Sequence, residues 1–321
     1  MTESSSGAGK RSERPAVSVV VPSIGRPELI RALNSVRAQT ADADVEVIVV
    51  DDSGRKDRLP NGAQAIADMV IRTAGGVGGS GARNLGISRA SGDYVALLDD
   101  DDEWMPHKLE AQLALLRSAP DCKRAVVAGR QVYVDKRSGS SSQPGPKRLI
   151  AHDETVEHYL FRRRSPNASR ASMYTSTLMC PKELAVSVPW DGSLARHQDW
   201  DWLIRLGRTP GTTFHQTAEP IVRIQLGSSR SISAGTDWEA SLAWADRLLS
   251  EDPEIYCDFV VAQSLRYALT ARSSRGVRTV LGALLRRQRF PALGPAIVGV
   301  AGVLPRQTFE RVVVATSRKR A

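Results

Sequence analysis

Short apolar runs alternate with helical patterns over the first hundred residues. Runs at 17–21, 45–50, 69–73 and 94–98 are rich in Val, Ile and Leu and predict buried strands. The stretches between them, at 27–38, near 64 and at 82–90, predict helices. Strands that alternate with helices in this way are typical of a parallel sheet covered on both faces. We therefore expect an α/β fold that begins at Val17.

The two ends of the chain have a different character. Residues 1–16 are rich in Ser, Gly, Lys, Arg and Glu and lack an apolar stretch, so we expect a disordered leader rather than a signal peptide. Residues 236–321 read as helical, with helices expected at 238–249, 254–271 and 278–287. The predicted organisation is a leader (1–16), an α/β domain (17–235) and a helical C-terminal extension (236–321).

Polar or glycine-rich segments follow each predicted strand, which is where parallel sheets bind their ligands. In chain order they are Pro22 and Ser23, Asp51 and Asp52, the glycine-rich residues 75–81, and the four aspartates Asp99, Asp100, Asp101 and Asp102. Four adjacent carboxylates repel one another unless a positive charge lies among them, and their oxygens are ligands that Mg²⁺ and Mn²⁺ prefer. This run predicts a cation site that serves a phosphate; a solvated acidic turn is the alternative.

The acidic run stands out because the chain as a whole is basic. With 44 Lys and Arg against 35 Asp and Glu, the chain carries a net charge of +9, which suits an anionic partner. Aromatic residues make up only 5% and no nucleic-acid-binding signature is present, so we do not expect a nucleic-acid partner. The three cysteines are far apart and have no metal-binding spacing, which indicates reduced thiols in a cytoplasmic protein.

The glycine-rich segment allows two interpretations. Gly76, Gly78 and Gly81 fit the spacing of a dinucleotide fingerprint, which would make the chain an NAD(P)-dependent oxidoreductase. However, that fingerprint usually follows the first strand, and this one follows the third. The other interpretation is a flexible loop before a helix whose backbone amides, with Arg83, approach a pyrophosphate.

Taken together, the motifs resemble the inverting family 2 nucleotide-sugar glycosyltransferases, which have the GT-A fold. The resemblance runs from 17 to about 233 and rests on VSVVVPSIGRPELIRALNSVRAQT, EVIVVDDSG, GGSGARNLGISRASGDYVALLDDDDEW and HQDWDWLIRL. It implies a Rossmann-like nucleotide-binding sheet that becomes mixed in the acceptor half. It also implies a UDP-type sugar donor, a hydroxyl-bearing acceptor, Mn²⁺ or Mg²⁺, and inversion at the anomeric carbon.

The resemblance assigns roles to individual residues. Asp52, with Asp51 beside it, would contact the base or ribose of the donor, and the backbone near Pro22 and Ser23 would close over the nucleotide. The metal ligands would be Asp99 and Asp101 of the DxD motif with the adjoining Asp102. The remaining donor-binding residues would be Arg83 and Asn84 beside the diphosphate, Asp100 in the acidic run, and Arg230 in a closing loop.

Transfer also needs a base for the attacking hydroxyl. Asp199 resembles that base, although Gln198 stands where the family usually has Glu. His197, which titrates near neutrality when unperturbed, and Asp201, otherwise a surface carboxylate, are the alternatives. A further set of side chains could either stack on an acceptor sugar or pack in the core: Trp190, Trp200 and Trp202.

The apolar stretch at 291–304 is too short to span a bilayer and is flanked by arginines. Such a segment could lie in the headgroup region of an anionic membrane. It could equally pack on the catalytic domain or at a homodimer interface. A non-catalytic metal- or membrane-binding module therefore stays open as a third reading of the chain.

Overall fold

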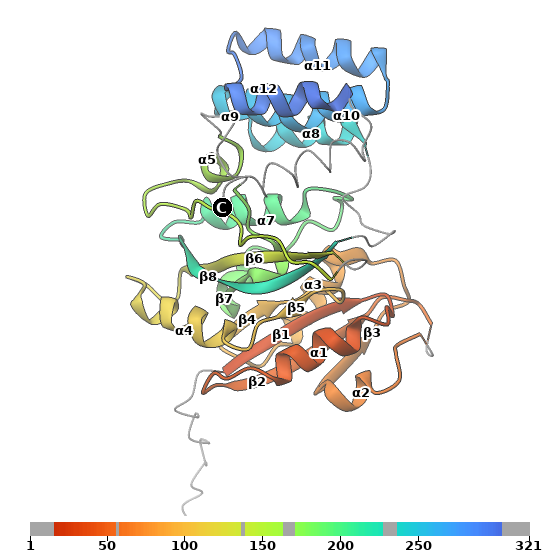
Figure 1. Cartoon of the computed structure of the whole chain (residues 1–321), viewed down its shortest axis with the longest axis vertical. Helices are drawn as coiled ribbons and strands as arrows, with labels where there is room; N and C mark the ends of the chain where they lie inside the picture. Colours follow the sequence, from red (N-terminus) through yellow and green to blue (C-terminus); the bar gives the residue numbers. More distant parts are fainter. Residues whose placement is uncertain (1–15, 56–57, 136–138, 163–170, 227–235, 304–321) are drawn as a thin grey trace, which may run out of the picture.

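The structure is a computed structural model that describes residues 16–55, 58–135, 139–162, 171–226 and 236–303. One eight-stranded sheet, with strand order β3-β2-β1-β4-β7-β6-β8-β5, forms the centre of the molecule. Helices cover both of its faces, and a further group of helices is stacked at one end (Figure 1). Residues 1–15 of the predicted leader, Arg230 and the end of the chain lie outside the described residues, whereas Ala16 already belongs to the first strand.

Half of the sheet is parallel. It consists of β1 (Ala16–Ser23), β2 (Asp44–Asp51), β3 (Met69–Arg72) and β4 (Tyr94–Leu97). Each strand falls within one or two residues of a run of apolar residues in the sequence, because β1, β2 and β4 bury most of their side chains on both faces, whereas β3 is a partly exposed edge strand. The prediction of a parallel α/β sheet is confirmed.

The other half of the sheet is mixed, as expected for the acceptor half. Here β7 (Met179–Pro181) runs antiparallel to both β4 and β6 (Ala125–Asp135). Strand β8 (Thr213–Leu226) runs parallel to β6, and the short β5 (Glu103–Trp104) pairs antiparallel with β8. Since β5 directly follows the four aspartates, its pairing with β8 fixes the acidic run between the two halves.

Two hydrophobic clusters lie on opposite faces of the sheet. One contains α1 (Leu29–Arg37), α2 (Ala63–Ile66) and α4 (Lys108–Ser118). The other contains α3 (Gly78–Arg89), α5 (Val156–Phe161), α6 (Lys182–Ser187) and α7 (Gln198–Gly207). Successive side chains of β1 alternate between the two clusters, as the period of two in a strand requires: Val19 and Val21 face the first, Val20 the second.

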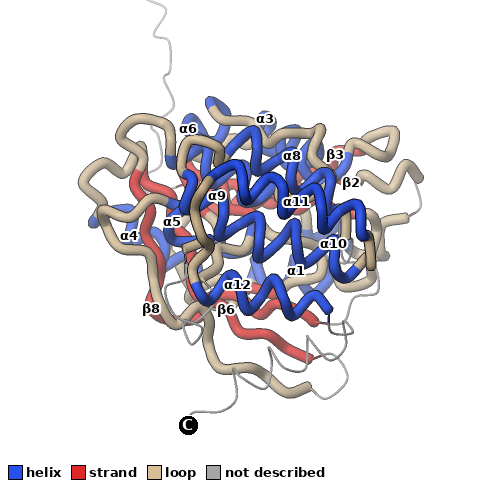
Figure 2. Tube along the Cα trace, turned by 90° about the horizontal axis from the view of Figure 1, so that it is seen from above, coloured by secondary structure: helices blue, strands red, loops and turns tan. Residues whose placement is uncertain are grey.

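The C-terminal region is helical, as predicted. It comprises α8 (Trp238–Leu248), α9 (Pro253–Phe259), a π-helical turn at Val260–Leu265, α10 (Arg266–Thr270), α11 (Ser274–Arg287) and α12 (Leu293–Val300). Viewed from that end, α9 to α12 form the outer layer (Figure 2). Buried side chains of this region, including Trp244 and Phe259, belong to the same cluster as Trp202 of α7. None of the described helices is long and apolar enough to cross a membrane.

Candidate active site

The carboxyl ends of β1, β2 and β4 meet at one edge of the sheet. Ser23 ends β1 and pairs with Asp51, the last residue of β2. The next residue, Asp52, donates its backbone N–H to the carbonyl of Ser23 at 2.8 Å. The four aspartates follow β4 by one residue. The topology therefore brings the predicted donor-binding segments together, as parallel strands require.

Two arginines supply positive charge to the acidic run. Arg83 lies 2.6 Å from the Oδ1 of Asp99, and Arg26 lies 3.0 Å from Asp100 and 2.9 Å from Asp101. Arg26 was missed by the sequence reasoning, although it stands three residues after Ser23, at the end of the first strand. The solvated-turn alternative does not hold, since Asp100 and Asp102 are buried.

Asp100 and Asp102 differ in what holds them. Asp100 accepts a hydrogen bond from Ser23 Oγ at 2.7 Å, and burial raises its pKa to about 6 against the opposing effect of Arg26. Asp102 accepts hydrogen bonds with both oxygens, from Ser176 Oγ at 2.6 Å and from the N–H of Gln225 at 3.3 Å. Burial first, and then repulsion by Asp99, raises the pKa of Asp102 well above its usual value.

These contacts bear on the predicted metal ligands. Within the described part of the chain, no group of three or more His, Cys, Asp and Glu side chains could by itself hold a metal ion. Asp102 has both oxygens engaged by protein donors, whereas Asp99 and Asp101 are each partly exposed. Mg²⁺ is commonly held by one or two carboxylates together with substrate phosphates, and this pair suits that arrangement.

Asp52 closes the glycine-rich loop. Its Oδ2 accepts the N–H of Gly78 at 2.9 Å, and its Oδ1 accepts the N–H of Val77 at 3.1 Å and the hydroxyl of Thr73 at 2.5 Å. The carboxylate of Asp52 thus lies at the N-terminus of α3, where the helix dipole and the free amides favour an anion. With this support, α3 begins at Gly78, four residues earlier than predicted. The amides that would meet a dinucleotide pyrophosphate are thus already occupied by a carboxylate of the chain.

Asp51 is the most buried carboxylate at this edge, with 1% of its surface exposed. Its Oδ1 accepts the N–H of Ser53 at 3.0 Å. Its Oδ2 has no hydrogen-bond partner among the described residues, and the nearest cation, Arg72, lies 3.9 Å away. Pro22, one residue before the end of β1, pairs with Val50 and belongs to the same edge.

The guanidinium of Arg83 stacks on the ring of Trp190. Its guanidinium carbon lies 4.7 Å from the ring centroid of Trp190. The side chain of Asn84 fixes the position of Trp190. Its Nδ2 donates to the backbone carbonyl of Trp190, and its Oδ1 accepts the backbone N–H of Trp190, both at 2.8 Å. Asn84 therefore contacts Trp190, and contact with the diphosphate stays a prediction. Gly79 leaves the necessary room, because a Cβ there would lie 2.9 Å from Arg83 Nη1.

Asp199 lies in the first turn of α7 and shares the electrostatic environment of the acidic run. Burial raises the pKa of its carboxyl, the N–H of Trp200 and the charge of Arg83 lower it, and Asp99 raises it. The predicted base is therefore near enough to Arg83 and Asp99 of the predicted donor site to be influenced by their charges. A raised pKa favours proton acceptance in a carboxylate that would otherwise be a weak base.

The alternatives to Asp199 have other contacts. His197 is buried, stacks on Trp200 with ring centroids 5.0 Å apart, and lies 3.0 Å from Ser241 Oγ. Burial and the nearby Arg196 lower its pKa to about 3, so it is a poor base. Asp201 is not the expected surface carboxylate: it is 1% exposed and accepts hydrogen bonds from Arg205, Arg247 and Trp244.

The three tryptophans also separate. Trp202 is fully buried, and Trp190 is 2% exposed and stacks on it with centroids 4.5 Å apart. Both are core residues. Trp200 is partly exposed and meets Phe161 edge to face at 5.3 Å. Of the three, Trp200 alone is placed to contact an acceptor.

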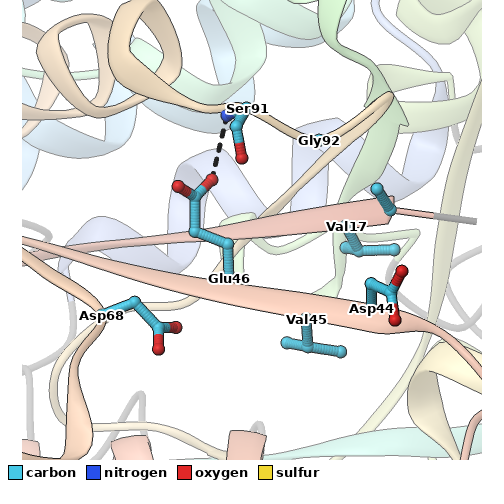
Figure 3. Close-up of a pocket in the computed structure, with 8 residues that line it drawn as sticks. Val17, Asp44, Val45, Glu46, Asp68, Ser91 and Gly92 are labelled. Carbon is cyan, nitrogen blue, oxygen red and sulfur yellow. Dashed lines mark hydrogen bonds between the residues drawn. The ribbon is translucent and has the colours of Figure 1, made fainter. Parts of the chain in front are cut away.

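A hollow of about 220 Å³ lies at the opposite edge of the sheet (Figure 3). Two of its three carboxylates already have partners: Glu46 accepts the N–H of Ser91 at 2.9 Å, and Asp68 accepts that of Val47 at 2.7 Å. It lies at the amino ends of β1 and β2, away from Asp52 and the acidic run. We therefore assign it no part in the candidate site.

Comparison with known proteins agrees with this geometry. The sequence model of Glycosyl transferase family 2 matches residues 18–174. The amylovoran biosynthesis glycosyltransferase AmsB of Erwinia amylovora is 29% identical over 273 residues, which cover 80% of this chain and 86% of that protein. This chain carries a glycosyl transferase family 2 domain at residues 18–174. It is therefore a glycosyltransferase, and the oxidoreductase and non-catalytic interpretations are set aside.

Two further similarities extend the comparison. The succinoglycan biosynthesis protein ExoW of Rhizobium meliloti (strain 1021) is 41% identical over 113 residues, 33% of this chain and 35% of that protein. The crystal structure of S. aureus TarS 1-349 in complex with UDP-GlcNAc has a TM-score of 0.59 at 14% identity, covering 94% of this chain and 89% of that one. The family 2 glycosyltransferase described here thus has the GT-A fold.

Proposed function

We propose that this glycosyltransferase moves a sugar from a UDP-type nucleotide sugar to an acceptor hydroxyl, with inversion at the anomeric carbon. The observation that carries the proposal is that Arg83 and Asp99, which pair with each other at 2.6 Å, lie close enough to Asp199 to shift the pKa of its carboxyl. This links a partly buried carboxylate of raised pKa to the donor-binding edge. Support for the donor comes from TarS, whose related fold was crystallised with UDP-GlcNAc and with UDP.

On the donor side, each residue has a role that follows from its contacts. Asp52 fixes the loop that faces the nucleoside, with the buried Asp51 and the β1 end at Pro22 and Ser23 beside it. Arg83, supported by Trp190, offers its charge to the diphosphate. Asp100 holds Arg26 and Ser23 in position. Arg230 would add a second cation, as the family resemblance implies.

Asp99 and Asp101 would hold Mn²⁺ or Mg²⁺, which when bound stabilises the negative charge of the leaving diphosphate as a Lewis acid. Their partial exposure and the repulsion within the run support this assignment. Asp102, first expected to be a third ligand, is better suited to positioning the run through Ser176 and Gln225.

Asp199 would take the proton of the acceptor hydroxyl as that oxygen attacks the anomeric carbon from the face opposite the diphosphate. Trp200, one residue on, would offer an aromatic edge to the acceptor sugar. Two relatives are named for the biosynthesis of amylovoran and of succinoglycan, and a sugar acceptor for this chain is consistent with those names. We place the reaction in the cytoplasm, where nucleotide sugars are used.

Calorimetry with UDP tests the donor and the metal together. UDP should bind tightly with Mn²⁺ and weakly with a chelator, and Asp101→Asn should lose the Mn²⁺-dependent part. Asp44→Asn, an exposed carboxylate at the far end of β2, is the matched control and should bind as the wild type does. A donor at 100 times its Kd should also stabilise the fold by about 2.7 kcal/mol. Mn²⁺-dependent UDP affinity that survives in Asp101→Asn would remove the metal assignment.

A further inference from the structure

Exposed apolar side chains gather at the helical end of the molecule. Ten large hydrophobic side chains are exposed among the described residues, and seven of them fall between 281 and 303. They are Leu281, Leu285, Phe290, Leu293, Ile297, Val300 and Val303, which we call the apolar end patch. Phe290, in the connection between α11 and α12, is 94% exposed. These two helices lie at the end farthest from the sheet (Figure 1).

Helix α12 exposes its large apolar side chains, the reverse of the usual arrangement. In a helix packed on a core, large apolar side chains face inward. Here Leu293, Ile297 and Val300, spaced four and three residues apart, are 59%, 49% and 64% exposed. The buried positions are instead Gly294, Pro295 and Gly299. The helix thus turns a stripe of large apolar residues to the outside.

The glycines explain how the reversed helix packs. A Cβ at Gly299 would lie 2.7 Å from Val261 Cγ1, and one at Gly302 would lie 2.6 Å from the carbonyl oxygen of Arg266. The backbone of α12 therefore lies directly on the π-helical segment. Since that close approach needs no large side chain, the outward Leu, Ile and Val contribute little to the inner contact, and their burial must come from elsewhere.

The surroundings of the patch carry charge of one sign. Residues 259–303 contain no Asp or Glu and seven arginines: Arg266, Arg272, Arg275, Arg278, Arg286, Arg287 and Arg289. Of these, Arg278, Arg286 and Arg289 are exposed and have no ion pair with an acidic side chain in the described parts of the chain. Apolar residues beside uncompensated arginines are the two components of binding to anionic lipid.

We propose that the apolar end patch docks on an anionic phospholipid surface, with α12 lying in the plane of the headgroups. The eight residues of α12 are far too few to span a bilayer, so the contact is peripheral. The inference is independent of the proposed sugar transfer. The two are linked in space, however, because a small cavity is lined by both Pro295 of α12 and Trp200, the neighbour of Asp199.

Vesicle sedimentation with the whole chain tests the proposal. Vesicles of phosphatidylcholine with 30 mol% phosphatidylglycerol should bind the protein at least about ten-fold more strongly than pure phosphatidylcholine at low salt, because each arginine near the surface favours the anionic bilayer. Binding should weaken as salt rises. Equal partitioning to both vesicles, or none to either, would overturn the proposal.

Three variants separate the components. Phe290→Ser with Ile297→Ser removes exposed apolar surface and should weaken binding at least about ten-fold. Arg286→Gln with Arg289→Gln should weaken it about 10- to 30-fold on anionic vesicles and hardly at all on neutral ones. Val186→Ser changes an equally exposed apolar residue on α6, outside the patch, and should bind like the wild type.

The same variants would also reveal whether something other than lipid covers the apolar end patch. All the changed side chains are exposed, so the melting temperature should stay within about 2 °C of the wild type. If the protein is a dimer in vesicle-free buffer and Phe290→Ser with Ile297→Ser makes it a monomer, the patch is an interface between copies of the chain. If deletion of residues 304–321 is needed before vesicles bind, that segment covers the patch. Either outcome would refute the lipid assignment for the intact chain.

Discussion

Asp199 and Asp201 stand two residues apart on α7, and their side chains meet different surroundings. Asp199 faces Arg83 and Asp99 of the donor edge. Asp201 faces α8, where it accepts hydrogen bonds from Trp244 and Arg247. A helix turns by about 200° over two residues, which is why neighbours of one chemical type separate so completely.

Asp199→Asn should lower kcat by about 10² to 10⁴, because the amide cannot accept the acceptor's proton. Donor Kd should stay within a few fold, and stability should not fall, since the substitution removes a charge that its surroundings disfavour, as the raised pKa shows. In the wild type, the acid limb of the kcat profile should lie above the usual Asp pKa, because burial raises the pKa of Asp199. Full activity in Asp199→Asn would exclude it as the base.

Asp201→Asn is the matched comparison on the same helix. It weakens the ion pairs between the buried Asp201 carboxylate and the partly exposed Arg205 and the exposed Arg247, so the urea midpoint should fall by an amount that corresponds to about 1.5–3 kcal/mol. The turnover of the fraction that remains folded should be much closer to wild type than that of Asp199→Asn. Loss of kcat without loss of stability in Asp201→Asn would reverse the two roles.

His197 should make the fold sensitive to acid. Its folded pKa of about 3 lies below the unfolded value of 6.5, so the unfolded chain binds the extra proton between these values. Stability is therefore complete above pH 6.5 and is lost as pH falls, by about 2 kcal/mol at pH 5. His197→Asn, which tolerates the φ of 61° found here, should unfold with a flatter dependence between pH 5 and 7. Parallel profiles in urea would contradict this.

At the residue scale, the sequence alone did not predict the hydrogen-bond partners of the individual carboxylates. The types and the order of Asp52, Asp99 and Asp199 were sufficient to predict a donor edge and a base. The partners of Asp102 and Asp201 include Gln225 of β8 and Trp244 of α8, each more than forty residues away. No local pattern encodes which carboxylate such distant groups will occupy.

At the scale of elements, the glycine-rich loop and α3 act as one unit closed by Asp52. Asp52→Asn retains the size of the side chain but weakens the hydrogen bonds to Val77 and Gly78, so the loop should loosen. We expect the donor KM to rise about ten-fold with kcat nearly unchanged, since the loop faces the nucleoside and not the bond that breaks. Initial rates at varied donor concentration measure this; a fall in kcat at saturating donor would oppose it.

The elements themselves were largely predictable, because the parallel strands are runs of apolar residues and three of them, β1, β2 and β4, are mostly buried on both faces. The errors fall at the ends. Helix α3 begins four residues early since Asp52, from another strand, caps it. The helix expected at 254–271 contains a π-helical turn at Val260–Leu265, against which Gly299 of α12 packs. Both differences arise from contacts between segments that are distant in sequence.

At the scale of the whole molecule, one hydrophobic cluster joins the GT-A sheet to the C-terminal helices. Trp244 of α8, 3% exposed, lies 6.2 Å from Phe161 and 4.9 Å from Phe259 between ring centroids. Trp244→Ala should therefore destabilise the entire fold by about 3–5 kcal/mol. A single shifted transition in urea, seen alike by circular dichroism and by donor binding, is expected; two separate transitions would mean that the helices unfold alone.

Asp201 has a consequence for how such enzymes can be recombined. Its carboxylate lies on the catalytic side, and two of its donors, Trp244 and Arg247, lie on the C-terminal side. A chimera that joined this catalytic half to the terminal helices of a relative would bury an uncompensated charge unless the graft brought matching donors. Exchange of the C-terminal helices between relatives should therefore give a stable protein only where the equivalents of Asp201, Trp244 and Arg247 are all present.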